Sequence, residues 1–271
     1  MDSEFEGRVV LITGGASGIG RRVAEMLGER GARLALFDMN ADALNAVREE
    51  FARKDWAVVT TVGDSSVVED AEAFVRNAVE AYGRVDMLLN GAAIVVRKNL
   101  LETTPEEWRR VIDVDLNGYF YILRAAVPEI RKAGGGSIVQ IATIAAHIGF
   151  GYPSYTAAKG GVLSMTRELA GELAPYGIRI NSVSPGPTET GINVDTMGDA
   201  KIKAALVATT PSGRTGKPDD IARAVLFLLS PASEYINGAD LIVDGGMSSK
   251  IHFGSVAATF QSYHGESRAR A

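Results

Sequence analysis

Tyr155 and Lys159 are the two residues whose types and spacing point most directly to proton chemistry. They fall in a stretch predicted to be helical, and side chains four residues apart share one face of a helix. A free tyrosine has a pKa near 10, so only about 0.1% of it is phenolate at pH 7, and a neighbouring cation favours the phenolate. A tyrosine tuned in this way can pass a proton to or from an alcohol oxygen. A surface pair with no catalytic role is the alternative, because both residue types are common.

A glycine-rich turn near the N-terminus has the pattern of an anion site. The sequence TGGASGIG at residues 13–20 follows the first predicted strand and leads directly into a predicted helix. Glycine permits positive φ and lets backbone N–H groups approach a phosphate closely. The N-terminus of the following helix adds a partial positive charge. A strand before the turn and a helix after it are what the dinucleotide-binding fingerprint requires. A glycine-rich turn that binds no ligand is the alternative.

Asp38 ends the second predicted strand, 18 residues after Gly20. A carboxylate at this place can bond the two adenosine ribose hydroxyls of NAD, and it repels the 2′-phosphate of NADP. Residues 38–40 contain no Arg or Lys, and Ser17 occupies the turn where a basic residue would help to bind that phosphate. The sequence therefore predicts NAD as the cofactor. Asp38 also stands where it can cap the helix predicted over residues 41–54, and the two roles can coexist.

Short apolar runs alternate with longer amphipathic stretches along the chain. The apolar runs lack polar/apolar alternation, which is typical of strands covered on both faces. Strand and helix taking turns predict an α/β fold, a single doubly wound parallel sheet (Rossmann fold) with helices on both faces. The predicted strands are Val9–Thr13, Leu34–Asp38, Ala57–Val62, Met87–Asn90, Ser137–Ala142, Arg179–Ser184 and Leu241–Val243. The predicted helices are Arg21–Arg30, Ala41–Lys54, Val67–Tyr82, Pro105–Arg131, Ser154–Ala174 and Pro218–Leu229.

No break in composition suggests a second domain. We expect one dinucleotide-binding catalytic domain over residues 1–247 and a C-terminal extension over residues 248–271. Within the domain, residues 187–216 are rich in Thr, Pro and Gly around a short helical pattern at 200–207. That composition predicts a substrate lid.

The overall charge limits the classes of partner. The chain of 271 residues has 28 Lys and Arg against 33 Asp and Glu, a net charge of −5. This argues against nucleic acid or an anionic membrane as the main partner, because proteins bind both through a concentrated patch of positive charge. No apolar run reaches the length of about 18 residues that a membrane span needs, and the acidic N-terminus lacks the layout of a secretory signal. The chain has no cysteine, and no His/Asp/Glu cluster has metal-ligand spacing, so we expect a cytoplasmic protein without a metal site.

The motifs occur together in one order. TGxxxGIG spans residues 13–20, YxxxK spans 155–159 and NxxxPGxxxT spans 181–190. The ordered set resembles the short-chain dehydrogenase/reductase family, of the NAD-dependent alcohol dehydrogenase type. Further agreements are Asp64 after the third strand, Asn117 in DVDLNG, RTGKPDDIA at residues 214–222 and VDGG at residues 243–246.

The resemblance implies an oxidoreductase that interconverts a secondary alcohol and a ketone by hydride transfer with NAD(H). It implies that Tyr155 is the general acid/base, that Lys159 activates it, and that Asn117 kinks its helix and holds a water that links Lys159 to solvent. It also implies a homotetramer. The expected cofactor-binding residues are Gly14, Ser17, Gly18, Ile19 and Gly20 at the pyrophosphate, Asp38, Asp64 and Asn90 at the adenosine half, and Tyr155, Lys159, Pro185, Gly186, Thr188 and Thr190 at the nicotinamide half.

The sequence departs from the family pattern at two places. The family reads NNAG after the fourth strand, whereas this chain reads NGAA at residues 90–93, which should alter support of the sheet more than cofactor chemistry. The family also places a serine 13 residues before the tyrosine, and the residue at that spacing is Ala142, which has no hydroxyl. We expect the adjacent Thr143 to orient the substrate oxygen instead, because its hydroxyl donates and accepts as a serine does. In the alternative, that hydroxyl bonds local backbone.

Loops beyond the strand ends set substrate specificity in this fold. The expected substrate-pocket residues are Ile94, His147, Phe150 and Tyr152. This mostly apolar lining suits a hydrophobic or aromatic secondary alcohol and its ketone, the small-molecule substrate that we expect.

Two alternative functions remain open at this stage. Tyr152 lies seven residues before Lys159, the spacing of enoyl reductases related to the family, so an enoyl reductase or an epimerase on the same fold is one alternative. A non-catalytic dinucleotide-binding protein is the other, although a pure binder needs no proton relay.

Overall fold

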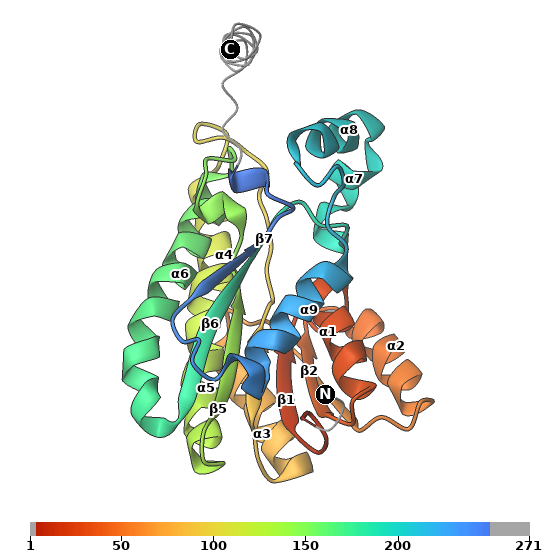
Figure 1. Ribbon diagram of the computed structural model, residues 1–271, viewed down its shortest axis with the longest axis vertical. Coiled ribbons are helices and arrows are strands. Elements are labelled where there is room, and N and C mark those ends of the chain that lie inside the picture. The colour runs from red at the N-terminus through yellow and green to blue at the C-terminus, as the bar shows by residue number, and fades with distance from the viewer. Residues whose placement is uncertain (1–3, 250–271) are drawn as a thin grey trace, which may run out of the picture.

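The computed structural model describes residues 4–249, and its centre is a seven-stranded sheet in the order β3-β2-β1-β4-β5-β6-β7 (Figure 1). All neighbouring strands are parallel. The strands are β1 Val9–Thr13, β2 Arg33–Asp38, β3 Val58–Val62, β4 Met87–Asn90, β5 Gly136–Ile141, β6 Ile178–Pro185 and β7 Asp240–Val243. From β1 the chain adds β2 and β3 toward one edge of the sheet. It then returns to the middle and adds β4 to β7 toward the other edge. Ligands bind at such a switch point, outside the carboxyl ends of the strands.

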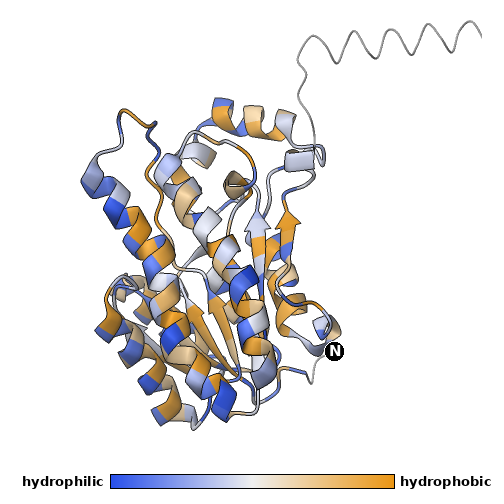
Figure 2. Ribbon diagram, turned by 90° about the vertical axis from the view of Figure 1, so that its left-hand side faces the viewer, coloured by the Kyte–Doolittle hydropathy of each residue, from blue (hydrophilic) through white to orange (hydrophobic). Residues whose placement is uncertain are grey.

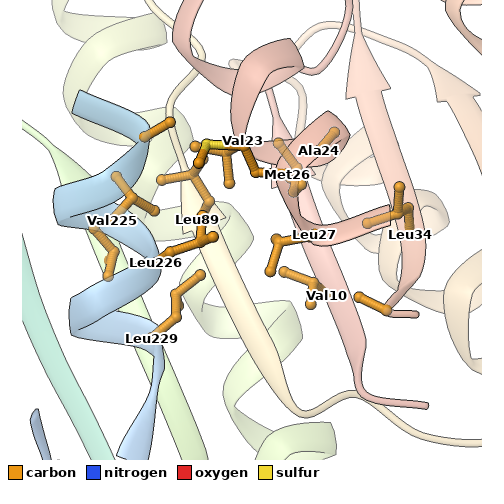
Figure 3. Packing of buried hydrophobic residues seen from close by; sticks show 14 of the residues in the cluster. Val10, Val23, Ala24, Met26, Leu27, Leu34, Leu89, Val225, Leu226 and Leu229 are labelled. Atoms are coloured by element: carbon orange, nitrogen blue, oxygen red, sulfur yellow. The ribbon is translucent and has the colours of Figure 1, made fainter. Parts of the chain in front are cut away.

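Helices cover both faces of this sheet. One apolar core joins α1, α2 and α9 to the strands, and a second joins α3, α5 and α6 to the opposite face. Figure 3 shows part of the first core, where Leu226 and Leu229 of α9 lie beside Leu27 of α1. The helices are α1 Gly18–Gly28, α2 Ala41–Ala52, α3 Val68–Tyr82, α4 Pro105–Ile112, α5 Gly118–Lys132, α6 Pro153–Leu173, α7 Val194–Gly198, α8 Ala200–Thr209 and α9 Pro218–Leu229. In Figure 2 the helices carry both hydrophilic and hydrophobic residues, as amphipathic helices packed on a sheet should.

The predicted α/β fold is confirmed, and most predicted elements differ from the observed ones only at their ends. The main exception is the helix predicted over 105–131, which is divided into α4 and α5 by a π-helical segment, Asp113–Asn117. A π turn inserts an extra residue into a helix and often lies at a functional site. It also changes which side chains face the sheet, which matters for the site below.

The segment predicted as a lid follows β6. It contains α7 and α8, and in Figure 1 both stand apart from the sheet, beyond the carboxyl ends of its strands. No residue of α8 is fully buried, and its N-terminus is capped by Asp199, which accepts from Lys201 N and Ile202 N. The helix predicted at 200–207 is therefore present, loosely attached to the rest of the domain. The C-terminal extension predicted from residue 248 lies outside the described residues, apart from 248 and 249.

Between residues 4 and 249, no helix combines the length and the apolar character that crossing a bilayer requires.

Candidate active site

A cavity of about 340 Å³ lies at the carboxyl ends of the strands. Its walls come from the glycine-rich turn after β1, the loop after β4, the segment after β5 and the lid segment after β6. Tyr155 and Thr143 line the same cavity. The topology thus brings together motifs that are far apart in the sequence.

The glycine-rich turn leaves a space free of side chains at the N-terminus of α1. Gly14 and Gly18 have φ of 70° and 54°, in the left-handed region that favours glycine. A Cβ on Gly20 would lie 2.2 Å from the carbonyl oxygen of Gly14, so this close approach requires glycine. Ser17 precedes the helix without a side-chain capping bond, which leaves the first-turn N–H groups to an anion. The turn fits the pyrophosphate of a dinucleotide, and Ile19 lines the same cavity.

Asp38 lies at the adjacent end of β2 and lines the cavity. Its Oδ2 accepts a hydrogen bond from Ala16 N at 3.1 Å, and its Oδ1 accepts one from Asn40 N at 3.0 Å. Asn40, not Asp38, caps α2, because the Asn40 side chain accepts from Ala43 N. Backbone bonds therefore fix the carboxylate, and each oxygen keeps acceptor capacity for a ribose hydroxyl.

Asp64 lines the cavity beyond Asp38, but protein groups already hold its carboxylate. Oδ2 accepts from the Arg110 guanidinium at 2.7 Å, and Oδ1 accepts from the Ser66 backbone N–H and hydroxyl. Burial raises the pKa of Asp64, but the bonds from Arg110 and Ser66 outweigh burial and hold that pKa below its ordinary value. Its expected contact with the adenine amino group stays a prediction.

Asn90 ends β4, and its side chain does not line the cavity, while the expected contact of its backbone with the adenosine half stays a prediction. Its buried side chain accepts from Thr13 Oγ1 at 3.0 Å and donates to the carbonyl oxygen of Tyr119 at 3.1 Å. These bonds tie β4 to β1 and to α5, and the cavity wall begins at the next residue, Gly91. These bonds satisfy the buried amide, which would be costly to leave unpaired.

Tyr155 lies at the start of α6, with its phenol beside Thr143. Burial and the nearby charge of Asp115 raise the pKa of Tyr155 well above its ordinary value, while a hydrogen bond with Thr143 and the charge of Arg97 act in the opposite direction. Thr143 Oγ1 also accepts from Ala145 N at 3.2 Å. The alternative of a bond to local backbone is therefore realised, yet the hydroxyl keeps its own proton to donate.

Lys159 has no exposed surface, and its ammonium faces three oxygen atoms. Nζ donates to the Tyr119 hydroxyl at 2.8 Å and to the Ile141 carbonyl at 3.0 Å, and it lies 3.5 Å from Asp115 Oδ2. Nζ is 5.8 Å from the centroid of the Tyr155 ring, on the shared face that the spacing predicts. Burial lowers the pKa of Lys159, and Asp115 counteracts this effect. The expected net lowering of the tyrosine pKa by Lys159 is not observed, because burial and Asp115 dominate.

The structure does not bring Asn117 to this cluster, so its expected role in the relay is a wrong prediction. Asn117 Nδ2 donates to Asp113 Oδ1 at 2.9 Å, within the π-helical segment. The distortion of the helix that was expected at Asn117 is present. The hydrogen bonds and ion pairs of Lys159 are with Tyr119, Ile141 and Asp115, and Asn117 is not among these partners.

Asp115 takes the place beside Lys159, and sequence reasoning missed it. It has no exposed surface; Oδ1 accepts from Ile94 N at 2.9 Å, while Oδ2 has no hydrogen-bond partner within the described residues. Burial raises the pKa of Asp115 to about 6, and the Lys159 charge limits this rise. One signal was available, because Asp115 stands four residues from both Val111 and Tyr119, which are buried. That spacing places a carboxylate on the buried face of the helix.

The far end of the cavity is mostly apolar. Ile94, Phe150 and Tyr152 line it as expected, and the rings of Phe150 and Tyr152 are 6.0 Å apart. Apolar residues of the lid, among them Met197 and Leu206, complete this end. The expected cofactor residues Pro185, Gly186, Thr188 and Thr190 all line the cavity where β6 leads into the lid.

His147 was expected in the pocket, and this prediction is wrong. Its Nε2 lies 2.8 Å from Asp240 Oδ2 and 3.3 Å from Ser184 Oγ, and it is not part of the cavity wall. The carboxylate at the start of β7 draws the imidazole toward the edge of the sheet. Loop sequence alone does not tell which way such a side chain turns.

Comparisons with known proteins agree with this geometry. A family model described as enoyl-(acyl carrier protein) reductase matches residues 14–248. A cyclohexanol dehydrogenase of Acinetobacter sp. (strain SE19) is 38% identical over 252 residues, which cover 92% of this chain and 98% of the relative. The chain belongs to the short-chain dehydrogenase/reductase family.

Other members of the family extend the comparison. An L-rhamnose-1-dehydrogenase of Scheffersomyces stipitis is 36% identical over 253 residues, covering 91% of this chain and 98% of the relative. The crystal structure of a levodione reductase superposes with a TM-score of 0.87 at 35% identity, covering 91% of this chain and all of that one. As a short-chain dehydrogenase/reductase, the chain is an oxidoreductase that acts on CH–OH groups with a nicotinamide cofactor.

Proposed function

We propose that this short-chain dehydrogenase/reductase interconverts a secondary alcohol and its ketone with NAD(H), with Tyr155 as the general acid/base. The observation that carries the proposal is the placement of Tyr155 and Thr143 on one cavity with the glycine-rich turn. A dinucleotide held at that turn would have the rest of the same cavity, which Tyr155 also lines, for its nicotinamide half. An alcohol oxygen between the two hydroxyls then has both a base and a hydrogen-bond donor.

The residues of the site divide the proton chemistry between them. In alcohol oxidation, the Tyr155 oxygen takes the hydroxyl proton, while Thr143 donates a hydrogen bond to the same oxygen as it becomes a carbonyl. In ketone reduction, Tyr155 returns the proton. When bound, the nicotinamide ring supplies the hydride acceptor or donor.

Lys159 and Asp115 are buried near Tyr155 and support this chemistry through their charges. A buried ammonium without a counter-ion is costly, and the carboxylate of Asp115 at 3.5 Å offsets that cost. We propose that Asp115 keeps Lys159 charged and in place, so that a positive charge remains near the phenol when it loses its proton. Asp115, and not Asn117, is thus the residue of this segment that lies beside Lys159.

NAD, rather than NADP, is the proposed cofactor because Asp38 lines the cavity at the end of β2, where a carboxylate can bond ribose hydroxyls and would repel a 2′-phosphate. Replacing Asp38 by Ala should lower kcat/KM for NAD by about 10- to 100-fold, since bonds to a charged group are lost, and should improve the use of NADP. Initial rates with both cofactors measure this effect. Asp42→Asn removes an exposed carboxylate of α2 and serves as the control. An unchanged NAD/NADP ratio in Asp38→Ala would contradict the assignment.

Thr143 is the proposed orienter of the substrate oxygen. Thr143→Val keeps the shape of the side chain but removes the hydroxyl, and it should lower kcat by about 10²-fold, the usual cost of losing one oxyanion donor. Thr143→Ser should retain activity within a few-fold. Equal activity of the Val and Ser variants would show that the hydroxyl serves only its bond to Ala145 N.

Reduction of a carbon–carbon double bond is the second candidate function. The description of the matching family model favours it, and Tyr152 lies in the cavity wall. The variants Tyr152→Phe and Tyr155→Phe discriminate between the two functions, because each removes one of the two candidate hydroxyls. The homotetramer and the cytoplasmic location stay predictions.

A further inference from the structure

Arg97 is a cation at the substrate end of the cavity that none of the assigned roles uses. It lies in the loop after β4 and lines the cavity with a half-buried side chain. One terminal nitrogen, Nη2, donates to the Ile192 carbonyl at 2.6 Å and to Asn193 Oδ1 at 2.8 Å. Both acceptors belong to the lid segment, so Arg97 joins the β4 loop to the lid across the mouth of the cavity.

The remaining donors of Arg97 are free within the described residues. A guanidinium has five N–H donors, and among the described side chains and backbone only those of Nη2 have partners. Among the side chains that the structure describes, no carboxylate lies within ion-pair distance of Arg97. Arg110, another cation on the cavity wall, is paired with Asp64 at 2.7 Å, and the neighbouring Lys98 is paired with Glu107. Arg97 is thus a half-buried charge that has no counter-ion among the described side chains.

Arg97 lies among the residues of the substrate end of the cavity. Arg97 and Tyr155 line the same cavity, and the charge of Arg97 is among the influences that lower the pKa of Tyr155. Its neighbours on the wall are apolar, among them Ile94, Ile192 and Met197. A ligand that fills this end meets an apolar surface with one positive charge on it.

We propose that Arg97 binds a carboxylate of the substrate, so that the preferred substrates are hydroxy acids with an apolar body and the matching oxo acids. The planar fork of a guanidinium suits a carboxylate, and the bond is strong where water is partly excluded. A substrate whose alcohol carbon reaches Tyr155 would place its carboxylate against the N–H groups of Arg97 other than those of Nη2. Nη2 itself stays bonded to the lid segment. This inference rests on the proposed alcohol/ketone reaction and narrows its substrate class.

A matched pair of substrates tests the inference by activity. With NAD as cofactor, the wild type should oxidise 3-hydroxycyclohexanecarboxylate with a kcat/KM about 10- to 100-fold above that of its methyl ester, the range expected for a charged hydrogen bond. Arg97→Gln should remove this preference, because kcat/KM for the acid should fall, chiefly through KM, by about 10- to 100-fold more than kcat/KM for the ester. Arg97→Lys should retain part of the preference, and Lys98→Gln should retain all of it. An equal loss for acid and ester in Arg97→Gln would mean that Arg97 only holds the lid, and would overturn the inference.

A binding experiment separates this inference from the proposed reaction. Isothermal titration of the NADH-loaded protein with cyclohexanecarboxylate, which has no hydroxyl to oxidise, should give binding that Arg97→Gln weakens about tenfold or more. Cyclohexanecarboxamide should bind weakly to both proteins. Binding of the carboxylate with no turnover of any alcohol would leave the anion site standing and defeat the proposed reaction. Turnover of neutral alcohols without binding of the carboxylate would defeat the anion site alone.

Discussion

Replacing Tyr155 by Phe should lower kcat for alcohol oxidation by about 10²- to 10⁴-fold, the range that a positioned acid/base contributes. The substitution removes one hydroxyl from a half-buried ring and keeps its packing against α6 neighbours. Cofactor affinity should change little, because the glycine-rich turn and Asp38 are untouched. The rate of NADH formation and the quenching of protein fluorescence by NADH measure the two quantities.

Tyr152→Phe is the matched control for this result. Tyr152 lines the cavity but stands at the N-terminus of α6, packed against Phe150. Its loss should change KM by a few-fold and leave kcat nearly intact. The reverse pattern, in which Tyr152→Phe is inactive and Tyr155→Phe is active, would support reduction of a carbon–carbon double bond and contradict our account.

Replacing Lys159 by Met should have the second-largest effect. The side chain has no exposed surface, so Met fills the space but removes the charge near the phenol, and we expect kcat to fall by about 10²-fold or more. Asp115 would be left buried without its cation, and breaking such a pair costs about 3–5 kcal/mol of unfolding free energy. Urea denaturation and initial rates measure the two effects.

The double variant Lys159→Met, Asp115→Asn distinguishes the two contributions. Removal of both charges should restore most of the lost stability, because no buried ion remains, while activity should stay low. Restored activity in the double variant would mean that Lys159 has only a structural role. In Asp115→Asn alone, Lys159 should keep its hydrogen bonds to the Tyr119 hydroxyl and the Ile141 carbonyl, and kcat should be lowered.

The raised pKa of Asp115 also predicts a pH dependence. Burial lifts this pKa from 3.8 to about 6, so the folded protein binds the proton more tightly than the unfolded chain does. The contribution of Asp115 to stability is therefore fully present below about pH 4 and is lost as pH rises through about 6. Activity should show the opposite trend, because the charged carboxylate holds Lys159. We expect the wild-type kcat/KM to fall below about pH 6, and this acid limb to be absent in Asp115→Asn.

Much of the fold could be predicted from the sequence, because strands buried on both faces appear as unbroken apolar runs. Val9–Thr13 and Met87–Asn90 are predicted to the residue for this reason. The parallel direction of the strands follows from their alternation with helices. The interrupted helix could not be predicted in this way, because a π turn leaves no mark on the apolar periodicity of residues 105–131.

Site residues whose position is set by the backbone could be predicted from the sequence. Those whose side-chain orientation depends on distant partners could not. The glycine-rich turn and Asp38 lie where their positions after β1 and β2 require. Asn117 and Asp115 are two residues apart, and only the turn of the helix decides which one faces Lys159. His147 turns to Asp240 because of a partner nearly a hundred residues away, which no local pattern reveals.

Transfer of a label from substrate to cofactor tests the central claim most directly. A secondary alcohol that carries deuterium on its carbinol carbon, incubated with NAD and the wild-type protein, should yield deuterated NADH that mass spectrometry detects, together with the ketone. Tyr155→Phe should give almost no label, whereas Tyr152→Phe should give it at nearly the wild-type rate. The account would be contradicted if deuterium transfer persisted in Tyr155→Phe. It would also be contradicted if the wild type transferred no deuterium from any alcohol of a panel that includes cyclic and open-chain compounds, both acidic and neutral.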